Sequence, residues 1–100
     1  MTDALARQLF QQNTEVETAP LQQETILFHP RSNRFCILNR TSSFIWSRLR
    51  SPMSPEQVAD ELSAAFDGVT RADALKDVTQ ALRTLMELDL VIVHFSEDLA

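Results

Sequence analysis

The side chains that can act as nucleophiles, bases or metal ligands are few and scattered. Cys36 is the only cysteine and lies inside an apolar run, and the two histidines, His29 and His94, lie far apart. A reactive thiol needs a lowered pKa, whereas apolar surroundings raise the pKa. One cysteine and two distant histidines also lack the spacing of a metal site. We therefore expect Cys36 to be a core residue and the histidines to be surface or turn residues.

The acidic residues do not indicate catalysis either. Glu56, Asp60 and Glu61 lie opposite the apolar stripe of a predicted helix, where a solvated face is usual and a catalytic carboxylate pair is not. Gly68 is the only glycine, which excludes a glycine-rich loop that cradles phosphates. The sequence thus predicts a protein that is not an enzyme and that uses no cofactor and no metal.

Charge is unevenly distributed in this chain, whose net charge is -5. Residues 25–55 contain five arginines and no acidic residue. This basic segment favours either an anionic partner or pairing with the protein's own acidic surface. The five are Arg31, Arg34, Arg40, Arg48 and Arg50.

Length and composition predict one small domain, because 100 residues with 44% apolar content leave little for a second core. No apolar run is long enough to span a bilayer, and the start of the chain lacks the apolar region of a secretory signal. A lone cysteine points to the reducing cytoplasm. We expect a flexible segment over 1–14, a domain over 15–95 and a tail over 96–100.

The sequence predicts secondary structure least clearly before residue 24. Leu5, Leu9 and Phe10 can share one face of a short helix begun by Asp3. Residues 16–21 read as an edge strand, since proline is tolerated only at an edge.

A β-hairpin follows, formed by residues 25–29 and 34–38 around a Pro-Arg-Ser-Asn turn. Strand alternation puts one set of side chains on the core face and the other set opposite. We expect the core set to be Ile26, Phe28, Phe35 and Ile37. The opposite face also holds apolar residues: Leu27, Cys36 and Leu38.

Three helices are predicted after the hairpin. The first is capped by Asn39 or Thr41 and ends near residue 51. The second begins with a capping box at Ser54, with proline at its first position, and stops at Gly68. The third begins at Thr70 and carries a sustained apolar stripe. Residues 90–95 read as a terminal strand or an apolar tail.

A two- or three-stranded antiparallel sheet followed by three helices predicts an α+β, winged-helix-like domain. A winged helix that binds DNA carries clustered basic residues on its third helix. Here residues 73–89 hold Lys76 and Arg83 against four acidic residues, which opposes phosphate binding. Nucleic-acid binding is therefore the alternative hypothesis for the function and not the favoured one.

An ordered set of apolar and polar positions runs from the hairpin to the end of the chain. It comprises Leu38-Asn39, Ile45-Trp46, the segment 56–62, Phe66, Asp77-Val78, Leu82, Leu85 and Leu90-Val91. This set resembles the PqqD-like family, the RiPP recognition elements, which bind the leader peptides of ribosomally synthesised and post-translationally modified peptides (RiPPs). The resemblance covers roughly residues 15–92, and this chain differs from many members in having Asp89 where they have glycine.

The resemblance implies a non-catalytic peptide-binding module that presents a precursor's leader to a separate modifying enzyme, such as a radical SAM enzyme, a cyclase or a leader peptidase. The leader is expected to add a strand to the sheet edge and to lie against the third helix. Either flank of that helix can face the peptide, the one with Thr79, Arg83 and Met86 or the one with Ala74, Asp77 and Ala81. The expected peptide-binding residues are Arg34, Phe35, Cys36, Ile37, Leu38, Leu75, Val78, Thr79, Leu82 and Met86.

Two further hypotheses remain open at this point. Arg34 and Arg40 flank the receiving strand and can pair with acidic leader residues or simply be solvated. A third function, dimerisation through the free edge or through residues 90–95, predicts an oligomer without any ligand.

Overall fold

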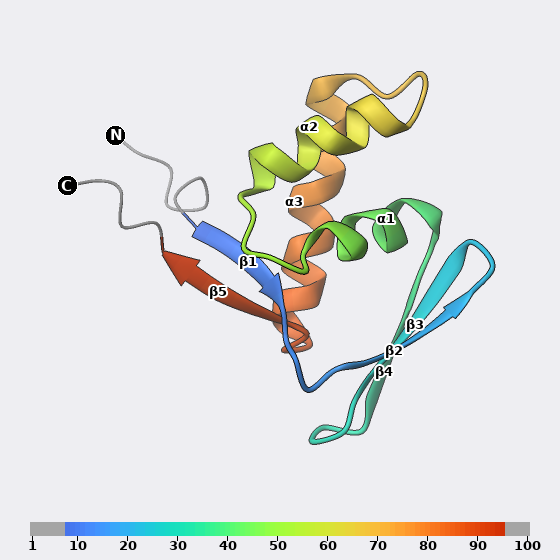
Figure 1. The fold of residues 1–100 in the computed structure, drawn as a ribbon, viewed down its shortest axis with the longest axis vertical. Helices are drawn as coiled ribbons and strands as arrows, with labels where there is room; N and C mark the ends of the chain where they lie inside the picture. The colour runs from blue at the N-terminus through green and yellow to red at the C-terminus, as the bar shows by residue number, and fades with distance from the viewer. Residues whose placement is uncertain (1–7, 96–100) are drawn as a thin grey trace.

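The computed structural model describes residues 8–95, which form two antiparallel sheets and three helices (Figure 1). This arrangement confirms the predicted α+β class. No helix among the described residues is long and apolar enough to cross a membrane. The elements are β1 (Gln8–Gln12), β2 (Glu17–Leu21), β3 (Glu24–His29), β4 (Arg34–Leu38), α1 (Arg40–Arg48), α2 (Pro55–Ala65), α3 (Arg71–Glu87) and β5 (Val91–Phe95).

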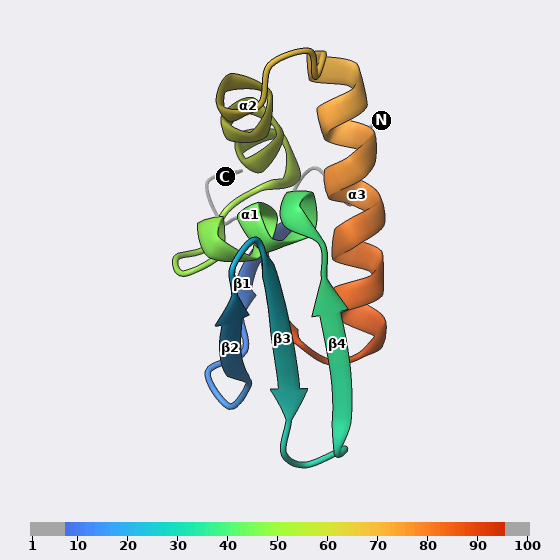
Figure 2. The same cartoon turned by 90° about the vertical axis from the view of Figure 1, so that its right-hand side faces the viewer.

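The larger sheet has the order β2-β3-β4, so β4 is an edge strand (Figure 2). The turn between β3 and β4 forms as the sequence predicts, and Asn33 takes the left-handed conformation there with φ 58°. The edge strand expected over residues 16–21 is also confirmed, as β2. Strands β1 and β5 pair separately into the second sheet, which confirms the terminal strand.

The helix predicted near the N-terminus is wrong for its described part. Gln8–Gln12 is strand β1, and Phe10 is fully buried at 0% exposure. The N–H of Phe10 donates to the Met53 carbonyl, and the N–H of Met53 donates to the Phe10 carbonyl. Leu5, the other residue of the predicted helix face, lies outside the described residues. Residues 8–12 are therefore packed into the fold, not loosely attached. Local spacing suggested a helix, but pairing with β5, distant in sequence, decided the outcome.

The two faces of the hairpin are the reverse of the prediction. Leu27 and Leu38 are buried at 0% and 5% exposure, whereas Phe35 and Ile37 are exposed at 66% and 67%. The hairpin is apolar on both faces, so alternation alone did not say which face the helices cover. The inner face also buries His29, at 2% exposure. Its Nε2 lies 3.4 Å from a carboxylate oxygen of Asp89 beyond α3, and its Nδ1 accepts from the Arg31 N–H.

Each helix starts where a side-chain cap was predicted. Asn39 caps α1 and accepts from the Ser42 N–H at 2.9 Å, which decides between the two candidate caps. Ser54 forms a full capping box with Gln57 at the start of α2, and Thr70 caps α3. These caps satisfy main-chain N–H groups that have no partner inside the helix.

The end of α3 is held by a left-handed residue. Asp89 has φ 59°, and the neighbouring Leu90 N–H donates to the Leu85 carbonyl at 2.8 Å. Aspartate tolerates this conformation better than most residues do. It therefore serves at this turn as a glycine would, and the chain can reverse from α3 into β5.

Candidate functional site

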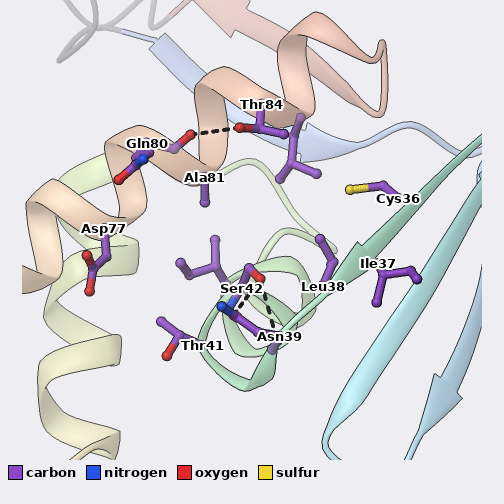
Figure 3. A pocket seen from close by; sticks show the side chains of 12 residues that line it. Cys36, Ile37, Leu38, Asn39, Thr41, Ser42, Asp77, Gln80, Ala81 and Thr84 are labelled. Atoms are coloured by element: carbon purple, nitrogen blue, oxygen red, sulfur yellow. Dashed lines mark hydrogen bonds between the residues drawn. The ribbon is translucent and has the colours of Figure 1, made fainter.

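A hollow lies between β4, the start of α1 and α3. Its volume is about 390 Å³, enough to receive side chains of a bound peptide. In Figure 2, α3 runs beside β4 along the free edge of the sheet, and Figure 3 shows side chains from all three elements around the hollow. We call it the edge groove. It is lined by Cys36, Ile37, Leu38, Asn39, Thr41, Ser42, Ile45, Asp77, Gln80, Ala81, Thr84 and Leu85.

The edge groove has an apolar part and a polar end. Its apolar floor is made by the buried Leu38, Ile45 and Leu85. At the polar end, Asp77 of α3 faces the start of α1, where Thr41 lies (Figure 3). This combination suits an amphipathic ligand whose apolar part is buried and whose polar part stays near water.

Nothing in the groove resembles a catalytic centre. Burial raises the pKa of the Cys36 thiol above its ordinary value, which keeps it protonated and weakly nucleophilic. The described residues hold no group of three or more ligating side chains that fits a metal ion. The lining offers hydroxyl, amide and carboxylate groups for hydrogen bonding.

The register of the sheet shows which main-chain groups are free on β4. Pro20 has no N–H and pairs with Thr25, so that pair cannot exchange two hydrogen bonds. Along an antiparallel strand, successive residues direct their N–H and C=O groups to opposite sides. Thr25 therefore directs its N–H and C=O groups to β4, where it is paired with Leu38. The same alternation turns the N–H and C=O groups of Phe35 and Ile37 away from β3. They point outward along the free edge.

The other edge of this sheet is less accessible to a peptide. Strand β2 carries Pro20 as its fourth residue, which removes one donor and stiffens the strand. Strand β4 has no proline, and only Arg34 among its residues is charged. A peptide strand can therefore add to β4 more readily than to β2.

The predicted site residues divide into two groups. Cys36, Ile37 and Leu38 line the edge groove, and Arg34 and Phe35 lie on the same strand. None of the five predicted α3 residues lines it. Val78 and Leu82 are buried in the core. Leu75 and Thr79 line a hollow on another side of α3, and Met86 is exposed at 39%.

The flank of α3 that faces the groove carries Asp77, Gln80, Ala81 and Thr84. The sequence indicated Ala74, Asp77 and Ala81 as one of two possible flanks. Ala74 is instead buried in the core, and Gln80 and Thr84 were not among the predicted residues. Small side chains on this flank, Ala81 and Thr84, leave the space that the groove occupies. The small side chains are therefore the feature of the sequence that distinguishes the groove flank of α3 from the flank with Arg83 and Met86.

The basic segment is largely paired within the protein. Arg31 contacts Glu15 at 2.7 Å and Arg48 contacts Glu61 at 3.6 Å. The Arg40 guanidinium lies 5.0 Å from the centre of the Phe66 ring. Three of the five arginines thus have intramolecular partners, which weakens the case for a nucleic-acid surface.

Among the solved structures that match this chain in fold, two are described as leader-peptide complexes. One is described as TbiB1 in complex with the TbiA(beta) leader peptide, with 27% identity and a TM-score of 0.73, covering 90% of this chain and 98% of that one. The other is lasso peptide synthetase B1 complexed with the leader peptide, with 29% identity and a TM-score of 0.71, covering 83% and 96%. No curated protein matches the chain.

The family comparison agrees with these structures. Residues 24–91 match the family described as coenzyme PQQ synthesis protein D (PqqD). This range contains β3, β4 and all three helices, and therefore the whole edge groove. Because the match spans more than half of the chain, the protein belongs to the PqqD family, as a PqqD-like RiPP recognition element.

Proposed function

We propose that this protein binds the leader region of a ribosomally made precursor peptide at the free edge of β4, above the edge groove. The observation that carries the proposal is the open edge of β4 beside a groove with an apolar floor. The two similar structures, both described as leader-peptide complexes, support it. An extended peptide gains main-chain hydrogen bonds at such an edge and side-chain selectivity from the adjoining pockets.

The bound leader pairs with the outward main-chain groups of Phe35 and Ile37. Two residues with one donor and one acceptor each provide up to four hydrogen bonds. The leader side chain opposite Cys36 points to the edge groove, because directly opposed residues in paired strands share a face. Its two neighbours point to the outer face, beside Phe35 and Ile37. Arg34 lies at the beginning of β4 and can meet an acidic leader residue.

The protein presents the leader to a separate modifying enzyme and supplies no chemistry of its own. Tethering a precursor in this way raises the effective concentration of its modifiable part near the enzyme. The outer face of the larger sheet is the surface we favour for this enzyme, since Phe35 and Ile37 are exposed beside Phe28 and Ile26. Large exposed apolar residues gathered on one face are typical of interaction surfaces.

Arg48 and Arg50, two basic residues at and just beyond the end of α1, are an alternative contact for the enzyme but are less suited to this role. Arg48 pairs with Glu61 and lies 5.0 Å from the ring of Phe44, so binding a partner there would disturb existing contacts. An enzyme pull-down with Phe35→Ser and Ile37→Ser, against Arg48→Ser and Arg50→Ser, distinguishes the two surfaces. We expect loss of enzyme binding only with the first pair.

The direct test is an NMR titration of labelled protein with the leader of the precursor encoded nearest to this chain. We expect saturable shifts at one peptide per protein, centred on β4, the start of α1 and the groove flank of α3. A parallel titration with random duplex DNA should leave these resonances unmoved. Shifts with DNA that weaken steeply with salt, and none with the leader, would overturn the proposal in favour of nucleic-acid binding.

A further inference from the structure

We infer that the edge groove reads two leader side chains spaced two residues apart, an apolar one beside Cys36 and a positively charged one at Asp77. This inference rests on the proposed function and adds the class of leader sequence that the site selects. It follows from the spacing of residues along β4 and from the charge at the polar end of the groove.

The spacing comes from strand geometry. Cys36 and Leu38 are alternate residues of β4 and project to the same, inner face, and both line the groove. A peptide strand paired with β4 places the residues opposite them on this face too. Those two peptide side chains are about 7 Å apart, which is two strand residues. The intervening peptide residue points to the outer face and does not enter the groove.

The subsite beside Cys36 is apolar. Among the residues that line the groove, Leu85 is buried at 1% exposure and Ala81 of α3 adds only a methyl group, so space remains for a ligand side chain. A charged group placed here would lose its hydration without gaining an opposite charge. We therefore assign an aliphatic or aromatic leader residue to this position.

The subsite near the end of β4 carries a negative charge. Asp77 is the only charged residue among those that line the groove, and within residues 8–95 it forms no ion pair. Lys76, its neighbour in sequence, lines the hollow on another side of α3. Arg40, the basic residue at the start of α1, stacks on Phe66. The carboxylate of Asp77 is thus available to a cation of the ligand.

Hydrogen-bonding groups surround this carboxylate and favour a long, flexible cation. Gln80 and Thr41 line the groove near Asp77, and Figure 3 shows Thr41 across from it. The Asn39 side chain already caps α1 by accepting from Ser42, so the helix start is not left free for an anion. A lysine or arginine stem can cross the groove and reach Asp77 while its apolar part covers the floor.

The test is a charge scan of the leader of the precursor encoded nearest to this chain. Lysine, glutamine and glutamate are placed in turn at each leader position, and Kd is measured by fluorescence anisotropy with the wild-type protein and with Asp77→Asn. We expect one position where lysine binds up to about fivefold more tightly than glutamine, as for a partly exposed ion pair. Replacing the apolar residue two positions away with serine should weaken binding at least tenfold.

Asp77→Asn should abolish the lysine preference at that position. Glu87→Gln, which removes a carboxylate from the same helix but outside the groove, should retain it. A lysine preference that is equal in wild type and Asp77→Asn overturns the inference, and so does a preferred position without an apolar partner two residues away. If the leaders bind without any Asp77-dependent preference, leader binding stands and only this inference fails. If no leader in the scan binds, the proposed function itself fails.

Discussion

Filling the edge groove should weaken leader binding strongly without unfolding the protein. Ala81 lies on the groove flank of α3 and is only partly buried, so Ala81→Phe would project an aromatic ring into the open space of about 390 Å³. That ring would take up groove space that a leader side chain would otherwise fill. Burying one large apolar side chain contributes about 1.5–3 kcal/mol. Losing it should raise the Kd for the leader about 10- to 150-fold.

A matched control is available on the same helix. Ala72→Phe adds the same ring to an exposed position of α3 that faces away from the edge groove. Fluorescence anisotropy should show wild-type leader affinity for Ala72→Phe, and thermal unfolding should show that both variants remain folded. Equal affinities for the leader in Ala81→Phe and wild type would refute the reasoning, because the groove would then not be occupied by the peptide.

Three further predictions concern reactivity and stability. Alkylation of Cys36 should be slower than that of a free cysteine at pH 8 and should shift to higher pH, because burial raises its pKa; saturating leader should slow it further, as mass spectrometry with iodoacetamide can measure. Leu27→Ala should destabilise the fold by about 2–5 kcal/mol, whereas Ile37→Ala should cost less than about 1 kcal/mol; equal losses in urea denaturation would contradict the observed orientation of the sheet. Ser54→Ala should cost about 1 kcal/mol in the same assay through loss of the capping box, and Ser54→Thr should restore most of it.

Sequence reasoning was most successful where local chemistry decides the structure. The caps at Asn39, Ser54 and Thr70 depend on a side chain and the N–H groups two or three residues later, so both partners are visible in a short stretch. The reversal at Asp89 is local in the same sense. The family resemblance also rested on such short-range order along the chain.

Sequence reasoning was wrong where partners distant in the chain decide. Residues Gln8–Gln12 form strand β1 because β5 pairs with them, and nothing in their own sequence indicates that pairing. The orientation of the hairpin depends on which face the helices cover. With Leu27 on one face and Phe28 on the other, alternation is equally satisfied both ways. His29 is buried on the inner face, where its ring lies next to Asp89. Its burial could not be predicted without knowing where the turn after α3 lies.

The candidate site was half predictable for the same reason. The strand that receives a peptide follows from a run of apolar residues that stops at Asn39. The flank of α3 that faces it depends on how the helix is rotated about its axis, and that rotation follows from packing. Val78 and Leu82 point into the core, which leaves Ala81 toward the groove.

The unequal edges of the larger sheet limit how the protein can associate with itself. Growth of a continuous ribbon of molecules needs two receptive edges on each one, and Pro20 obstructs pairing along β2. Within this sheet, contact through β4 joins two copies head to head and then stops, because β2 offers no second receptive edge. Any such pair competes with the leader for the same hydrogen bonds. An excess of precursor should therefore separate such a pair into single molecules.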